Sequence, residues 1–415
     1  MKVISGKFFY NDEIKEIDVG IEEGKIVEIK KHIVTEERYE FPEGVIIPSM
    51  VDMHVHFREP GYTWKEDFES GSLSALHGGV TFYIDMPNTN PPTNSLENFI
   101  LKYNLAKSKS YVDFGIAYLL DNKVEKNIED IVTSFKIYMS ETTNVKPLNP
   151  LIIPEITKDI TKNITVHAEW PECIKKYEEN SLNDHDKNRP ETCEIKAVRF
   201  LVNNVDGKIH IAHVSSPDSV DIALAKKFTT EVTPHHLFLN KNMQLGAFGK
   251  VNPPLRSEHV SGMLLEYLSS GIIDVVASDH SPHSPEEKEN FNLAPSGLPG
   301  VETSMPLLLM EMKRGNISLN RLVKVVSENP GKLLNIKKGK IELGYDADFV
   351  IFHLSSEKRI KAKNLHYKCG WTPFENMDAI FPDYVFIRGE MAIKKGEEII
   401  NPGYGKYYPE NEFLK

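Results

Sequence analysis

The sequence lacks several features that would place the protein in one of the large specialised classes. Its 415 residues include only three cysteines, Cys173, Cys193 and Cys369, and these form no close metal-binding or redox motif. We expect all three to be thiols of a protein from a reducing compartment. No apolar run approaches the roughly 18 residues of a membrane span, and the N-terminus has no apolar signal segment. We therefore expect a cytoplasmic protein without a membrane partner.

An excess of positive charge is also absent. The formal net charge is −11, which argues against nucleic acid as a partner but is compatible with a locally basic pocket for a small anion. No glycine-rich phosphate loop follows the first apolar strand, which disfavours a doubly wound nucleotide-binding sheet. The composition, 40% hydrophobic and 26% charged, is that of a globular protein that folds around its own core.

Strand-like and helix-like segments alternate along most of the chain. Apolar, β-rich runs occur near 44–56, 79–86, 111–119, 133–139, 163–168, 208–214, 228–234 and 272–279. Helical patterns separate them near 66–77, 95–108, 147–160, 191–204, 216–226, 257–270 and 302–314, and residues 122–131 form a shorter helical candidate. Eight strand–helix units predict a (β/α)8 barrel over residues 44–340. Residues 1–43 and 341–415 are short β segments with tight turns, and we expect them to join as one small β-sandwich domain.

Residues able to bind a metal recur where the predicted strands end. His54 and His56 alternate along the first strand, so their side chains project from the same face. Further candidates end the fourth, fifth, sixth and eighth strands: Lys136, His167, His213 and Asp279. Because the carboxyl ends of barrel strands share one face, we expect all six side chains to converge there. Imidazole and carboxylate groups favour zinc, with cobalt or manganese as alternatives.

The size of this ligand set predicts two divalent ions, since one ion with an open position needs fewer groups. Lys136 lies within an apolar strand, where a charged amine is costly to bury. An ammonium cannot coordinate a metal, but a neutral amine that takes up carbon dioxide becomes a carbamate with two anionic oxygens. Such a group can bridge two ions. His235 and His236 follow the seventh strand, and we expect them to support the site rather than bind metal.

The segment Asp52–Gly61 (DMHVHFREPG) resembles the signature of the dihydroorotases, a branch of the cyclic amidohydrolases. Matching segments cover nearly the whole chain: Gly78–Thr81, Met86–Thr89, Phe135–Met139, Asn188–Glu191, Val251–Arg256, Asp279–His283 and Gly297–Gly300. The resemblance implies a metal-dependent hydrolase that reversibly cyclises N-carbamoyl-L-aspartate to dihydroorotate in de novo pyrimidine synthesis.

The resemblance also implies roles for individual residues. His54, His56 and Asp279 would hold one zinc ion, His167 and His213 the other, and carboxylated Lys136 would bridge them. Asp279 would in addition carry the reacting proton. The residues implied to contact the substrate are Arg58, Asn88 and His283 at the ring carboxylate, and Asn252, Ser296 and Gly297 at the ring. Arg58 also fits on physical grounds, because it follows His56 by two positions and its planar guanidinium suits a carboxylate.

Two other functions are compatible with parts of this pattern. A hydantoinase, dihydropyrimidinase or allantoinase would share the metals but act on rings without a carboxylate, so Arg58 and His283 separate these enzymes from a dihydroorotase. A non-catalytic scaffold would be expected to have lost ligands, and none is missing. A homo-oligomer or a complex with other pyrimidine-pathway enzymes is compatible with the sequence. The loop at 140–144 either closes over the substrate through Thr142 or Thr143, or is a passive turn.

Overall fold

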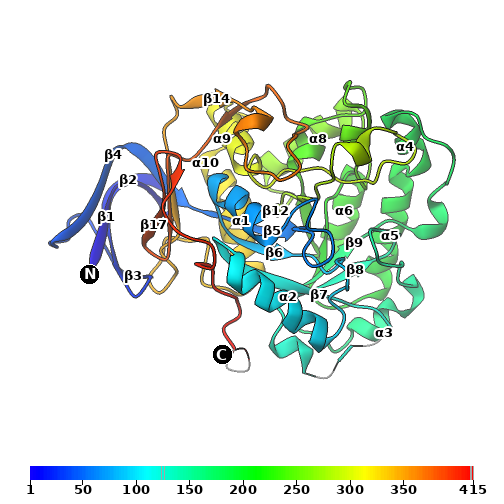
Figure 1. Cartoon of the computed structure of the whole chain (residues 1–415), viewed down its shortest axis with the longest axis horizontal. Helices are drawn as coiled ribbons and strands as arrows, with labels where there is room; N and C mark the ends of the chain where they lie inside the picture. Colours follow the sequence, from blue (N-terminus) through cyan, green and yellow to red (C-terminus); the bar gives the residue numbers. More distant parts are fainter. Residues whose placement is uncertain (123, 126, 412–413, 415) are drawn as a thin grey trace.

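The architecture combines a barrel of parallel strands with a β-rich part built from both ends of the chain (Figure 1). The computed structural model describes residues 1–122, 124–125, 127–411 and 414. Within them, the expected (β/α)8 barrel with a small β-domain from the two chain ends is confirmed. Residues 412, 413 and 415 of the expected small domain lie outside the described residues.

Eight parallel strands form the barrel, and each pairs with the next one along the chain. They are β5 (Met50–Val55), β6 (Val80–Asp85), β7 (Asp113–Leu119), β8 (Ser134–Tyr138), β9 (Ile164–His167), β10 (Ile209–Ile211), β11 (Thr229–Val232) and β12 (Val275–Val276). A parallel bridge between Val55 and His280 brings the last strand back to the first. Each strand lies within a range predicted from the sequence, because strands covered by helices on the outside read as nearly continuous apolar runs.

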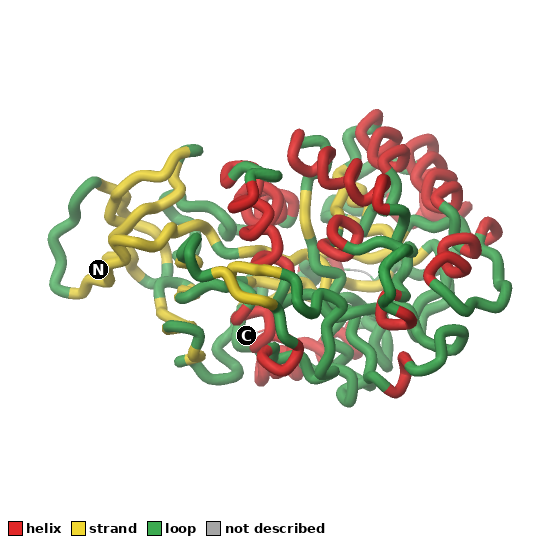
Figure 2. The backbone as a smooth tube through the Cα atoms, turned by 90° about the horizontal axis from the view of Figure 1, so that it is seen from above, coloured by secondary structure: helices red, strands yellow, loops and turns green. Residues whose placement is uncertain are grey.

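Helices surround the barrel strands (Figure 2). The predicted helices appear as α1 (Phe68–His77), α2 (Leu96–Lys109), α3 (Ile153–Thr157), α5 (Glu191–Asn204), α6 (Pro217–Ala225), α8 (Glu258–Ser270) and α9 (Ser304–Arg314). Asp67 begins α1 by accepting a hydrogen bond from the Ser70 backbone N–H, a capping box. Short helices that the sequence did not predict are α4 (Leu182–Asn188), α7 (Pro234–Phe238), α10 (Leu319–Val323), the π-helix η6 (Lys324–Glu328) and α11 (Asn329–Leu333). Single 3-10 turns are η1 (Ile128–Asp130), η2 (Pro150–Ile152), η3 (Pro171–Cys173), η4 (Gly246–Gly249), η5 (Glu286–Lys288) and η7 (Ala362–Asn364).

The small β-domain is one continuous sheet in the order β18-β17-β16-β13-β4-β1-β2-β3, where a sandwich would have two separate sheets. Its strands are β1 (Lys2–Tyr10), β2 (Glu13–Glu22), β3 (Lys25–Lys30), β4 (Glu37–Pro48), β13 (Phe349–Phe352), β16 (Tyr384–Ile387), β17 (Glu390–Lys394) and β18 (Glu397–Glu398). β4 joins the chain ends, because it pairs with β1 on one side and β13 on the other. The expected boundary between residues 43 and 44 falls inside β4. A separate pair, β14 (Glu357–Arg359) and β15 (Asp378–Ile380), packs beside α9.

The cysteines differ from the expectation. Cys173 and Cys193 form a disulfide that links η3 to α5, so the prediction of three thiols is wrong for this pair. Cys369 is a buried free thiol. Among the described residues, no helix has the length and apolar character needed to cross a membrane.

A buried lysine joins the small β-domain to the barrel. The Lys338 ammonium lies 2.6 Å from Asp113 Oδ2, 2.8 Å from Asp346 Oδ2 and 2.7 Å from Asp348 Oδ2. Asp113 begins β7 of the barrel, whereas Asp346 and Asp348 lead into β13 of the small sheet. Arg388, which follows β16, also pairs with Asp113. Burial alone would lower the pKa of Lys338, but the negative charges of Asp348 and Asp346 raise it above its ordinary value. The lysine is therefore charged and serves as the cation between the three carboxylates.

We expect Lys338→Met to destabilise the protein strongly, because it leaves three buried carboxylates without their central cation. The loss should be about 3–5 kcal/mol, as for other broken buried ion pairs. Urea denaturation, followed by circular dichroism, measures it. Lys340→Met is the matched control: Lys340 pairs with Glu342 at the surface and should contribute less than about 1 kcal/mol. Equal shifts in the two variants would contradict the role given to Lys338.

Candidate metal centre

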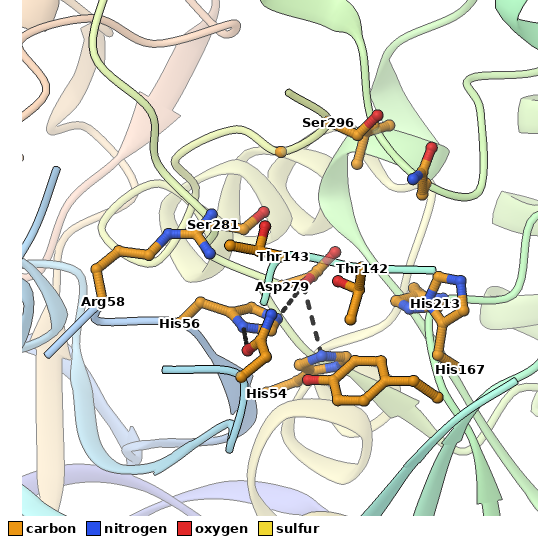
Figure 3. A pocket seen from close by; sticks show the side chains of 15 residues that line it. His54, His56, Arg58, Thr142, Thr143, His167, His213, Asp279, Ser281 and Ser296 are labelled. Carbon is orange, nitrogen blue, oxygen red and sulfur yellow. Dashed lines mark hydrogen bonds and ion pairs between the residues drawn. The ribbon is translucent and has the colours of Figure 1, made fainter. Parts of the chain in front are cut away.

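A polar pocket lies where the barrel strands end (Figure 3). All of the predicted site residues except Lys136 and His283 line it. Those two side chains are fully buried beside it. Three of the lining residues have positive backbone φ angles, which are uncommon outside glycine: Arg58 at 64°, His213 at 36° and Asp279 at 45°. Sharp turns directly after the strands therefore aim these side chains into the pocket.

His54, His56 and Asp279 form a compact group of potential ligands. Asp279 Oδ1 lies 3.5 Å from His54 Nε2 and 3.2 Å from His56 Nε2, and one ligand atom from each residue fits within 4.8 Å of the others. All three residues are buried. Burial lowers the pKa of both histidines, so their rings are neutral and keep a lone pair for a cation.

His167 and His213 make up the second group, which lies apart from His54 and His56 in Figure 3. His167 Nδ1 and His213 Nε2 are 2.9 Å apart. Burial holds the pKa of His213 well below its ordinary value, and the neighbouring His167 ring disfavours a second positive charge there. The ring centres of His54 and His213 are 5.4 Å apart, so the two groups border a common space.

Hydrogen bonds hold three of these rings with one nitrogen turned toward the pocket. The bonds join His54 Nδ1 to Glu231 Oε1 at 2.5 Å, His56 Nδ1 to Asn88 Oδ1 at 2.6 Å, and His167 Nε2 to Glu169 Oε2 at 2.8 Å. Histidines that bind metals almost always donate their other N–H to such an acceptor. The arrangement therefore fits divalent cations at the pocket-facing nitrogens of these rings and at Asp279.

Lys136 is fully buried at the base of this space. Its Nζ lies 3.1 Å from His54 Nε2, and among the described residues no carboxylate is ion-paired with it. Burial lowers the pKa of Lys136 to about 8, although the negative charges of Glu231 and Asp279 oppose the shift. The neutral form of this amine is therefore much easier to reach near pH 7 than that of an exposed lysine.

The residues expected around the substrate fall into two groups. Arg58, Asn252, Ser296 and Gly297 line the pocket, and Asn88 lines it while also bonding His56. His283 lies outside the lining, with its Nε2 atom 3.1 Å from Arg58 Nη2 and 3.1 Å from the Ser296 carbonyl oxygen. Gly297 has φ 140°, and a Cβ there would lie 2.4 Å from the Ser281 carbonyl oxygen, so only glycine fits.

Several residues that shape the site were not predicted. Glu231 bonds His54 and, through its other oxygen, His210 Nε2 at 3.0 Å. Glu169 is held by Arg189, whose Nε lies 3.1 Å from Glu169 Oε1. The Tyr138 hydroxyl is buried at the pocket without a hydrogen-bond partner among the described residues. A charged residue within an apolar strand was the available signal for Glu231, as it was for Lys136.

Thr142 and Thr143, on the loop at 140–144 that either closes over the substrate or is a passive turn, line the pocket.

Comparison with known proteins identifies relatives over nearly the full chain. Residues 45–392 match the amidohydrolase family. A dihydroorotase of Thermoplasma acidophilum is 40% identical over 97% of this chain and 96% of its own length. A dihydroorotase of Methanosarcina acetivorans is 39% identical, with 97% and 93% covered.

Solved structures give a similar result for the fold. An L-hydantoinase (dihydropyrimidinase) from Arthrobacter aurescens superimposes with a TM-score of 0.93 at 27% identity, with 98% of both chains covered. A D-hydantoinase (dihydropyrimidinase) from a Thermus species gives a TM-score of 0.88 at 26% identity, again with 98% of each chain covered. The frame of the barrel and small sheet is thus common to enzymes whose names indicate different cyclic amides.

Proposed function

The chain belongs to the amidohydrolase family and, within it, to the dihydroorotases, and from this premise we propose that it cyclises N-carbamoyl-L-aspartate to dihydroorotate, reversibly, in the cytoplasm. It is a hydrolase of cyclic amides. The choice of substrate rests on one observation: Arg58 lines the same pocket as the His54–His56–Asp279 group. The net charge of −11 favours a small molecule over a nucleic acid.

We propose that His54, His56 and Asp279 hold one divalent ion and that His167 and His213 hold a second, with zinc as the metal. The neutral imidazoles and the hydrogen bonds on their outer nitrogens support this assignment. Bound ions supply a nucleophile from water at neutral pH and polarise a carbonyl oxygen. The protein's part is to hold the ring carbonyl and the attacking water together in the pocket.

Lys136 is proposed to be carboxylated. Its neutral amine adds to carbon dioxide, forming an N–C bond and releasing one proton, and the product carries a negative charge. Such an anion would be well placed, because Lys136 Nζ lies 3.1 Å from the His54 nitrogen that faces the pocket. The modification would also replace a buried cation without an ion-pair partner by an anion beside proposed cations.

Lys136→Ala should be inactive toward dihydroorotate, because the proposed bridging anion is lost. Short carboxylic acids added with metal should restore part of the activity. Wild-type enzyme prepared with 13C-labelled carbon dioxide should show a carbamate signal by NMR that Lys136→Ala lacks. Lys208→Ala, at an exposed lysine, should keep both the signal and the activity. An unmodified amine in metal-loaded, active enzyme would contradict this proposal.

Asp279 is proposed to move the proton of the reaction. It is buried within 3.5 Å of His54 Nε2 and 3.2 Å of His56 Nε2, at the centre of the pocket. Burial raises the pKa of this carboxyl group, which makes it a better proton acceptor. In hydrolysis Asp279 would accept a proton from the attacking water and deliver it to the leaving ring nitrogen. Ring closure would use the same carboxyl group in reverse.

Asp279→Asn separates ligand binding from proton transfer. Asparagine keeps a carbonyl oxygen for a metal ion but cannot accept a proton. We expect a loss of at least about 100-fold in kcat, within the usual range for removal of a general acid–base, while the metal content measured by mass spectrometry stays at one ion or more per chain. A metal-loaded variant with near wild-type turnover would assign the proton to another residue.

Arg58 distinguishes this proposal from hydantoinase activity, because only the dihydroorotate ring carries a carboxylate. Arg58→Met should cost about 2–4 kcal/mol of transition-state binding, or roughly 30- to 1,000-fold in kcat/KM for dihydroorotate. Turnover of uncharged dihydrouracil or hydantoin should change far less. Arg199→Met, at an exposed arginine of α5, is the control and should leave all rates unchanged. An equal loss on charged and uncharged rings would refute the assignment.

A further inference from the structure

Lys65 lies behind the part of the pocket that contains Arg58, and none of the roles above involves it. Its side chain is buried, with 6% of the residue exposed. The Nζ atom is 2.7 Å from Glu287 Oε1 and 3.0 Å from His283 Nδ1. The Tyr62 ring centre is 5.6 Å away. Burial lowers the pKa of this amine, and the ion pair with Glu287 opposes that shift and favours the ammonium.

This contact determines which nitrogen of His283 carries hydrogen. An ammonium has three donors and no acceptor, so His283 Nδ1 must accept the hydrogen bond from Lys65. Burial holds the pKa of His283 well below its ordinary value, and Arg58 lowers it further, so the ring is neutral with a single N–H. That hydrogen is therefore on Nε2, where the Ser296 carbonyl oxygen accepts it at 3.1 Å.

The tautomer of His283 in turn decides the state of Arg58. Arg58 Nη2 lies 3.1 Å from His283 Nε2, close enough for a hydrogen bond if one atom were an acceptor. With hydrogen on Nε2, both atoms are donors, and the arginine gains no partner from the ring. If the hydrogen were on His283 Nδ1 instead, His283 Nε2 would accept a hydrogen bond from Arg58 Nη2. This donor of the guanidinium would then have its partner within the protein. With hydrogen on Nε2, the Arg58 Nη2 donor remains available for an anion in the pocket.

We propose that Lys65 is a positioning residue that fixes His283 as an Nε2–H donor and thereby leaves Arg58 free to bind the carboxylate of the substrate. The inference rests on the proposed function for the identity of that anion. It differs from a purely structural ion pair between Lys65 and Glu287, which would hold the 58–66 and 281–288 segments together without affecting how the carboxylate binds.

Steady-state kinetics of the metal-loaded enzyme with dihydroorotate separate these two roles. In Lys65→Met, His283 can carry hydrogen on Nδ1, facing Glu287 Oε2 at 3.7 Å, and Nε2 can accept from Arg58. KM should rise about 10- to 100-fold, the effect of one charge-assisted hydrogen bond, with kcat within about twofold. Lys65→Arg keeps a donor and should restore KM to within about threefold of wild type.

Glu287→Gln is the matched control, because it breaks the ion pair but keeps the Lys65 donor at His283. Its KM should stay within about threefold of wild type. A KM rise in Glu287→Gln equal to that in Lys65→Met, or a loss in Lys65→Met confined to kcat, would overturn the proposal in favour of a structural ion pair.

The tautomer is measured directly by 15N NMR of histidine-labelled enzyme, with the His283 signals assigned from His283→Gln. Wild type should show hydrogen on Nε2, and Lys65→Met should show it on Nδ1. Hydrogen on Nδ1 in wild type would overturn the inference even if the kinetics agreed. Wild-type enzyme that binds metal but does not turn over dihydroorotate would instead refute the proposed function, and the NMR result would still decide the tautomer.

Discussion

Burial of polar groups at the end of the barrel is the constraint on which the site depends. The imidazoles of His54, His56 and His167 are almost completely buried, and burial keeps their rings neutral. A buried neutral imidazole still needs an acceptor for its N–H, and Glu231, Asn88 and Glu169 supply these acceptors. The carboxylates then need partners of their own, which His210 and Arg189 provide. The second nitrogen of each ring faces the pocket, where its neighbours are other candidate ligands: Asp279 beside His54 and His56, and His213 beside His167.

The buried Lys338 cluster and the candidate metal ligands lie at opposite ends of the barrel strands. The Lys338 cluster lies where β7 begins, at Asp113, whereas the candidate ligands follow the ends of β5, β9, β10 and β12. In (β/α)8 barrels the amino ends of the strands commonly carry residues needed for stability, and the carboxyl ends carry the active site. Both ends contain buried lysines in contrasting surroundings. Lys338 has three carboxylates around it and a raised pKa, whereas Lys136 lacks such a cluster and has a lowered one. The surroundings therefore shift the pKa of these two buried lysines in opposite directions, which keeps Lys338 as an ammonium and favours the neutral amine of Lys136.

Much of the fold was predictable because each signal was local. Apolar strands and amphipathic helices have distinct periods, and the ligands converge because they follow strand ends on one face. The features that were missed depend on long-range pairing. Glu231 meets His54 across 177 residues of sequence, and the disulfide joins Cys173 to Cys193 without any local motif. The bond between Asn88 and His56 was missed for the same reason. Spacing and strand ends indicated the candidate ligands and Arg58, and the family resemblance implied Asn88, Asn252, Ser296 and Gly297, but neither indicated the buried partners that orient the histidines.

Substrate selection and metal binding use different parts of the chain, and this separation explains how one frame serves several cyclic amides. The histidines proposed as ligands lie at or just after strand ends, where pairing with neighbouring strands fixes the backbone. Arg58, Ser296 and Gly297 lie on loops beyond the strands, with His283 packed beneath them. Loops change without disturbing the strand ladder, so the carboxylate pocket can vary while the ligands stay in place. The hydantoinase structures share the fold at 26–27% identity, which is consistent with this division. Under the proposed roles of Arg58 and Lys65, specificity depends on the donors around Arg58 that lack an acceptor within the protein, because a charged ring supplies that acceptor and an uncharged ring does not.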